Sequence, residues 1–152
     1  MPGWTNRGKY FSLGLMFRGS SVPTNYYMIL FTSATAPSSV SNVVADHTQI
    51  AAGNGYTAGG YQLTPGATDF DVWTEDDGNN RAYVQIKDIV WTASGGPIPL
   101  SGSGARYSAL TDDNATVADR ELYQYFDLVS DRTVSDGQTL TLQDCEIRIN
   151  ET

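Results

Sequence analysis

The stretch RAYVQIKDIVWTA, residues 81–93, has the alternating apolar pattern of a β-strand. Val84 and Ile86 share one parity, whereas Ile89 belongs to the other. The apolar face of the strand therefore changes between these residues. An extra residue in one strand of a pair shifts the pattern in this way, so the sequence predicts a long strand with a β-bulge at Lys87-Asp88.

A similar change of apolar face occurs near the end of the sequence. In the stretch from Thr139 to Ile149, Leu140 and Leu142 share one parity, and Cys145 shares the other with Ile149. The pattern predicts a second long strand, with a second bulge between these two halves, at Gln143-Asp144.

Further apolar runs bounded by turn-forming residues predict five more strands, at residues 25–32, 61–64, 69–75, 105–111 and 121–129. The first of these, with its run of aromatic and aliphatic residues, is expected to be covered on both faces. The last is expected to carry Leu122 and Phe126 on one face and Tyr123 and Tyr125 on the other. About eight strands with turns between them predict an all-β fold, a single β-sandwich or a jelly-roll-like barrel.

The length of 152 residues predicts one domain. Residues 1–19 are interpreted as an N-terminal arm, in which residues 1–9 are exposed and polar and residues 10–19 contain a possible short helix that ends at Gly19. Residues 20–152 form the single β domain.

Charge excludes several classes of partner. The chain has 9 basic and 17 acidic residues and a formal net charge of -8, and its basic residues are scattered singly. Nucleic-acid and anionic-membrane binding need clustered Lys and Arg, so we expect neither partner. No apolar run reaches the roughly 20 residues that span a bilayer. The opening residues, Met1 to Trp4, lack the features of a signal peptide, and we expect no export signal.

Candidate catalytic groups are few. His47 follows Asp46 and could join a serine in a triad, but the Gly-x-Ser-x-Gly turn is absent, so a loop or surface histidine is the favoured interpretation. Asp69 and Asp71 are two residues apart, a spacing that places both carboxylates on one face of a strand, as a glycosidase would need. With 17 acidic residues in the chain, such a pair is also expected by coincidence.

Two acidic turns and one cysteine are the remaining candidates for metal binding or nucleophilic catalysis. Asp76 to Asn80 and Asp112 to Asn114 resemble calcium-binding loops in composition but lack the ligand order of an EF-hand, and are interpreted as ordinary turns. Cys145 is interpreted as a small buried hydrophobic residue. We therefore predict no catalytic, metal-binding or cofactor-binding residues, no cofactor, and a protein that is not an enzyme.

Aromatic residues are concentrated near the N-terminus and in the stretch 121–129. Tyr and Trp are enriched at protein interfaces because they combine an apolar ring with a polar tip. Two interpretations remain open: these residues cover one face of a sheet, or they form an oligomeric or docking surface with the N-terminal arm lying across a neighbour. The predicted interface residues are Trp4, Tyr10, Phe11, Leu15, Phe17, Tyr123 and Tyr125.

Five stretches resemble small structural proteins of tailed bacteriophages: residues 6–10, 23–32, 53–60, 84–91 and 135–142. The resemblance extends from about Asn6 to Asn150 and consists of fold and turn signatures, not of catalytic motifs. It implies a head decoration (cement) protein or a tail-associated protein, assembled on the particle as a dimer or trimer. It implies no catalytic residues.

Taken together, the residues and the resemblance lead us to expect a non-enzymatic capsid decoration protein that bridges capsomers. Its partners would be the major capsid protein and further copies of itself, and its location the outer capsid surface of the virion after synthesis in the cytoplasm of the host bacterium. One alternative is a tail or fibre-associated protein that binds host-surface glycan through Trp73 or Trp91. Another is a virion-attached glycan hydrolase that uses His47 and the pair Asp69 and Asp71.

Overall fold

The computed structural model describes residues 3–150, which form ten strands, one α-helix and three 3-10 helices. The strands are β1 (Gly3–Trp4), β2 (Tyr26–Phe31), β3 (Tyr61–Leu63), β4 (Val72–Asp76), β5 (Arg81–Ile86), β6 (Ile89–Thr92), β7 (Ala105–Thr111), β8 (Leu122–Arg132), β9 (Thr139–Leu142) and β10 (Cys145–Asn150). The helices are α1 (Asn6–Phe17), η1 (Val44–Asp46), η2 (Asp77–Asn79) and η3 (Val117–Asp119).

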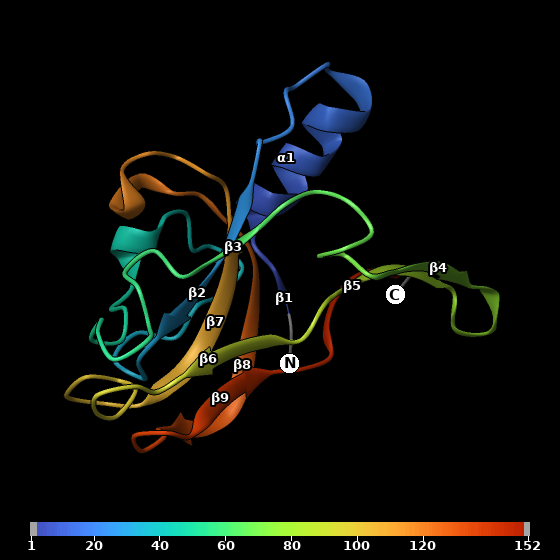
Figure 1. The fold of residues 1–152 in the computed structure, drawn as a ribbon. Coiled ribbons are helices and arrows are strands. Elements are labelled where there is room, and N and C mark those ends of the chain that lie inside the picture. The colour runs from blue at the N-terminus through green and yellow to red at the C-terminus, as the bar shows by residue number, and fades with distance from the viewer. Residues whose placement is uncertain (1–2, 151–152) are drawn as a thin grey trace.

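The strands form three antiparallel sheets. A five-stranded sheet has the order β1-β8-β7-β2-β3, a three-stranded sheet the order β10-β5-β4, and β6 pairs with β9 alone. We call the five-stranded sheet together with the β6–β9 pair the body, and the sheet β10-β5-β4 the outer sheet. Figure 1 shows α1 and the β4–β5 hairpin as separate projections from the body.

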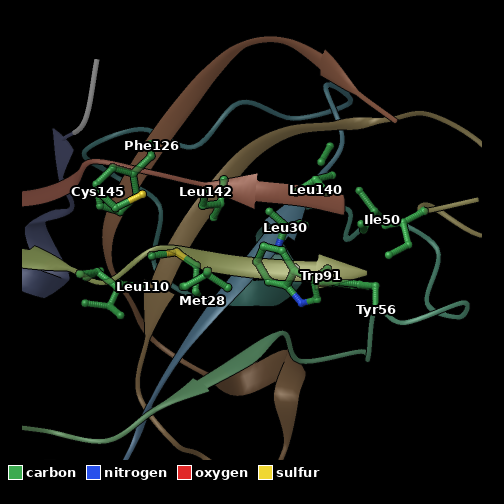
Figure 2. Close-up of a cluster of buried hydrophobic side chains, with 14 of the residues drawn as sticks. Met28, Leu30, Ile50, Tyr56, Trp91, Leu110, Phe126, Leu140, Leu142 and Cys145 are labelled. Atoms are coloured by element: carbon green, nitrogen blue, oxygen red, sulfur yellow. Dashed lines mark hydrogen bonds between the residues drawn. The ribbon is translucent and has the colours of Figure 1, made fainter. Parts of the chain in front are cut away.

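The main core lies between the five-stranded sheet and the β6–β9 pair. Met28 and Leu30 from β2 pack with Trp91 from β6 and with Leu140 and Leu142 from β9, and Figure 2 shows these side chains in one cluster. Two layers packed face to face make the fold a sandwich and not a closed barrel, so the predicted all-β class is confirmed.

The strand β2, which lies between β7 and β3, is covered on both faces, as predicted. Met28 and Leu30 face the main core, whereas Ile29 and Phe31 join Val44 in a second cluster on the other side of the sheet. Burial on both sides explains why this segment is a continuous apolar run and not an alternating one.

The two predicted bulges are one feature. Ile86 pairs with Cys145 and Ile89 pairs with Leu142, so Lys87-Asp88 and Gln143-Asp144 lie opposite each other with two residues on each strand. Both interruptions occur where they were predicted, but neither strand has an extra residue. The segments β5–β6 and β9–β10 together form one two-stranded ribbon, and its pairing is interrupted on both strands at the same place. This break is the boundary between the body and the outer sheet.

The faces of β8 differ from the prediction in one place. Leu110 pairs with Gln124, but the next residue, Thr111, pairs with Leu122, so Tyr123 is an extra residue in β8. This bulge turns Leu122 into the second cluster, whereas Phe126 lies in the main core. Leu122 and Phe126 therefore do not share a face, contrary to the sequence prediction.

The N-terminal segment is not an exposed polar arm. Residues 1–2 lie outside the described residues, but Gly3 and Trp4 pair with β8, and α1 begins at Asn6, before the predicted range of 10–19. Thr5 is fully buried, and its Oγ1 accepts a hydrogen bond from the amide of Gly8 at 2.9 Å, which caps the helix. The predicted end is confirmed, because Gly19 follows the helix with a φ of 68°.

Candidate docking surface

One side of α1 lies against the edge of the body. A β-carbon added to Gly8 would be 2.2 Å from the carbonyl oxygen of Tyr123, so only glycine allows the helix to lie this close to β8. The ring of Phe11 stacks on that of Tyr123, with centroids 4.5 Å apart and planes 3° apart. Arg7 donates from Nε to Glu121 at 2.9 Å. These contacts hold the helix in a defined position.

The opposite side of α1 is apolar and exposed. Tyr10 and Phe17 are each 72% exposed, and Leu13 and Met16 are exposed beside them. A surface helix normally directs polar residues to solvent, so a helix with apolar residues on both sides is typical of a helix that is covered twice. Four of the exposed large apolar side chains of the described residues thus lie on this one helix.

A cleft separates the inner side of α1 from the outer sheet. Its volume is about 340 Å³, and its lining is mostly apolar. Phe11 and Leu15 line it from the helix, Val84 and Ile147 from the outer sheet, and Phe70 from the loop before β4. The two walls are thus apolar surfaces that belong to different elements and only partly cover one another.

A second depression, which we call the α1–β10 groove, has a volume of about 580 Å³. Leu13 and Met16 from α1 and Ile149 from β10 supply its exposed apolar side chains. Lys9 supplies positive charge, whereas Arg148 is paired with Glu146 at 2.6 Å. At its base, the indole Nε1 of Trp4 donates to the carbonyl oxygen of Arg148 at 2.6 Å. Trp4 therefore ties the first strand of the body to the outer sheet.

The β4–β5 hairpin carries a single exposed indole. Trp73 is 89% exposed, and its pairing with Val84, which in turn pairs with Ile147, places it on the apolar face of the outer sheet. Asp71 and Glu75 flank it in sequence and are exposed. The hairpin thus presents an aromatic side chain surrounded by carboxylates.

The seven predicted interface residues fall into three groups. Tyr10 and Phe17 are exposed on α1, and Trp4, Phe11 and Leu15 line the cleft. Tyr123 is buried, and Tyr125 is half-buried against the second cluster. Burial, with the carboxylates of Asp112 and Glu121 nearby, raises the pKa of Tyr123. Tyr123 therefore supports α1 and is not available to a partner.

Sequence reasoning missed three residues of this surface, Leu13, Met16 and Ile149. A helix that starts at Asn6 places Leu13 and Phe17 at positions three and seven after Tyr10, which is helical spacing for one face. Recognition of Thr5 as the cap would have revealed this stripe. Ile149 had no such signal, because its exposure depends on where the outer sheet ends.

The ring of His47 is held by neighbouring groups through Nδ1, whereas its buried Nε2 has no hydrogen-bond partner in the described residues. Its Nδ1 donates to the carbonyl oxygen of Thr35 at 3.0 Å, and its ring packs against that of Phe31 with centroids 5.2 Å apart. Asp46 accepts hydrogen bonds from the backbone amides of Asn42 and Val43, which lower its pKa. The hydrogen bonds of both side chains thus go to the backbone of neighbouring loops and not to each other.

Asp69 and Asp71 do not form the predicted pair on one strand, because β4 begins only at Val72. Asp69 is buried and accepts from the amide of Thr64 at 2.7 Å and from Lys87 Nζ at 2.5 Å. The hydrogen bond from Lys87, followed by that from Thr64, lowers the pKa of Asp69. This carboxylate anchors the break in the ribbon, whereas Asp71 is exposed.

The remaining candidates are also explained by local structure. Asp76 accepts from Asn79 Nδ2 and Arg81 Nε, each at 2.8 Å, within the hairpin turn. Asp112 accepts from the amides of Asn114 and Glu121. Cys145 is buried at the break, and burial raises its pKa to about 12, which opposes thiolate chemistry.

Comparison of the chain with protein-family models, with curated proteins and with solved structures gave no match. Within residues 3–150, no group of three or more His, Cys, Asp or Glu side chains is arranged to hold a metal ion. The only α-helix of that range, α1, is too short to cross a membrane.

Proposed function

We propose that this protein is a non-enzymatic structural subunit of a tailed-phage virion, and specifically a decoration protein on the outer surface of the head. It would bind the major capsid protein at junctions between capsomers and brace the shell against the pressure of packaged DNA. The phage assignment comes from the resemblance of five stretches of the sequence to virion proteins. The structural role comes from the surface of the molecule.

The observation that carries the proposal is the apolar face of α1. Tyr10, Leu13, Met16 and Phe17 are exposed side by side on a helix that is already fixed to the body. Apolar patches of this kind on a folded protein mark surfaces that another protein covers. Aromatic residues and Met are also enriched at such interfaces, whereas a catalytic site would need convergent polar groups.

The mechanism is repeated burial of this surface. One standard contact buries roughly 1,600 Å² in total, and icosahedral symmetry repeats it at every equivalent junction. The net charge of -8 suits an outer location, because it keeps the protein from binding the packaged DNA. The sandwich acts as a rigid platform that holds the helix in place.

The test is the position of the protein on purified particles, measured by cryo-electron microscopy with icosahedral averaging. We expect density at every capsomer junction, with α1 facing a neighbouring subunit. A Tyr10→Ser, Phe17→Ser variant should detach from the particle, whereas Val40→Ser, which changes a side chain that is 70% exposed in another loop, should remain attached. Density at the tail alone would overturn the proposal.

A second candidate function is supported by Trp73. An indole that is 89% exposed beside carboxylates can stack on a sugar ring and accept hydrogen bonds from its hydroxyl groups. We keep a tail or fibre-associated glycan-binding protein as the alternative on this ground. Trp91 cannot contribute, because it is only 5% exposed. Binding of purified protein to host-surface glycan that is lost in Trp73→Ala would favour this alternative.

A further inference from the structure

We propose that the α1–β10 groove is filled by the β4–β5 hairpin of a second copy of this chain, with Trp73 as the anchor. The inference rests on the proposed function insofar as that function makes the exposed face of α1 a contact between subunits. It goes further by assigning Leu13 and Met16, which line the groove, to a contact with a second copy, whereas the particle test above concerns Tyr10 and Phe17.

The two surfaces match in chemistry, because each exposes apolar side chains. The groove has a volume of about 580 Å³ and exposes Leu13, Met16 and Ile149. Trp73 projects from a narrow hairpin and is 89% exposed. A Trp side chain buries roughly 150–250 Å² and is the residue type most often found as an energetic anchor of an interface.

Charge complementarity favours this occupant. The segment from Asn6 to Arg18 contains Arg7, Lys9 and Arg18 and no acidic residue, whereas residues 71–80 contain four acidic residues and no basic one. Among the described residues, Lys9 and Arg18 take part in no ion pair, and neither do the hairpin residues Asp71, Glu75 and Asp77. Arg148 in the groove is paired with Glu146 at 2.6 Å, so the free charge that lines the groove is that of Lys9, whereas the free charges of the hairpin are negative.

Contacts between two copies of the same element are disfavoured by the same charges. A contact between two α1 helices would bring two basic segments together, and a contact between two hairpins would bring two acidic ones together. The favoured contact is therefore between unlike surfaces, in which each copy offers one hairpin and one groove. Such contacts close as a reciprocal pair or as a ring, in agreement with the expected dimer or trimer.

The hairpin cannot reach the groove of its own chain. In the outer sheet, β5 lies between β4 and β10, and Trp73 pairs with Val84, which pairs with Ile147. Neighbouring strands are about 4.8 Å apart, so Trp73 is held two strand spacings from β10. The occupant has to come from another molecule.

The first experiment measures the mass of the purified chain over a range of concentrations by sedimentation equilibrium. We expect self-association that weakens about 30-fold or more in Trp73→Ala and in Met16→Glu. Val40→Ala and Val40→Glu are matched controls at an exposed apolar residue outside the groove, and should associate as the parent chain does. Thermal unfolding checks that all variants are folded.

The second experiment mixes the two defective variants. Trp73→Ala retains an intact groove, and Met16→Glu retains an intact hairpin, so a contact between unlike surfaces predicts that the mixture forms heterodimers although each variant alone is monomeric. Absence of the heterodimer would overturn the proposal in favour of a contact between like surfaces.

Two further outcomes would also overturn it: a parent chain that is monomeric at all concentrations, or an oligomer that Trp73→Ala leaves intact. Because these measurements use the purified chain without particles, they can fail while the location on the virion stands. A monomeric chain whose Met16→Glu variant no longer binds particles would assign the groove to the capsid protein instead.

Discussion

The two-stranded ribbon has an inner half, β6 and β9, and an outer half, β5 and β10, and these halves have different surroundings. In the inner half, β6 and β9 alternate buried and exposed side chains, and Trp91 is 5% exposed. In the outer half, β5 and β10 continue the same ribbon, but burial fades away from the break, and on the neighbouring strand Trp73 is 89% exposed. Both tryptophans lie on apolar strand faces, but Trp91 has the five-stranded sheet opposite it, whereas Trp73 has no such cover.

The alternation of apolar and polar residues therefore determines which face of a strand is apolar. It does not determine whether another part of the protein packs on that face. The five-stranded sheet covers the inner half along its whole length, so its apolar face becomes core. The outer half meets only α1, across a cleft of about 340 Å³, and its tip meets nothing in the described residues. We expect folding energy to come from the inner half and association from the outer half.

The largest effect on stability is expected from a substitution in the core of the inner half. We expect Trp91→Ala to lower the free energy of unfolding by about 3–5 kcal/mol, because it leaves a cavity among Tyr56, Tyr61 and the core strands. Trp73→Ala should change it by less than about 0.5 kcal/mol, since that indole is exposed. Urea unfolding followed by circular dichroism measures both. Equal losses in the two variants would contradict the distinction between the halves.

A smaller effect should follow from moving the helix that forms the other wall of the cleft. A β-carbon at Gly8 would be 2.2 Å from a backbone oxygen of β8, and we expect Gly8→Ala to cost about 1–3 kcal/mol. Gly14→Ala is the control, because its β-carbon would meet only the side chain of Ser20, whose hydroxyl at 2.6 Å can rotate away. We expect it to be neutral or stabilising by up to about 1 kcal/mol. Hydrogen exchange of α1 should increase in Gly8→Ala alone. Unchanged exchange in that variant would show that the close approach to β8 is not needed.

The smallest effect concerns the ion pair at the break. Lys87 lowers the pKa of Asp69 in the folded state below its ordinary value of 3.8. The pair therefore contributes stability above that value, and the contribution is lost as the pH falls through the folded pKa. We expect Asp69→Asn to lower the melting temperature slightly near neutral pH and to converge with the parent chain in acid. Parallel curves for the two proteins at all pH values would exclude this role for Asp69.

Much of the fold could be predicted because strand patterns are local. The predicted strand at residues 105–111 coincides with β7, and both interruptions of the ribbon lie at the predicted residues. The start of α1 could not be predicted in the same way. Thr5 caps the helix from a buried position beside β8, and Gly8 is tolerated there because β8 lies directly against it, so the helix depends on a strand more than 100 residues away.

The candidate surface was predicted only in part, for the same reason. Aromatic content near the N-terminus drew attention to Tyr10 and Phe17, which are exposed, but the buried Tyr123 was indistinguishable from them in the sequence. The type of a residue determines how much apolar surface its side chain has. Whether that area is available to a partner depends on the side chain that stacks on it, which for Tyr123 is Phe11.

The sequence by itself determined the all-β class, the run of β2 that is covered on both faces, and the place where the ribbon breaks. These follow from the alternation of side chains along a strand, which neighbouring residues set. Only the tertiary structure decided which apolar face stays open. A side chain is buried only when a second surface packs on it, and that surface comes from distant parts of the chain. For Trp73 and the α1–β10 groove, we propose that it comes from a second copy.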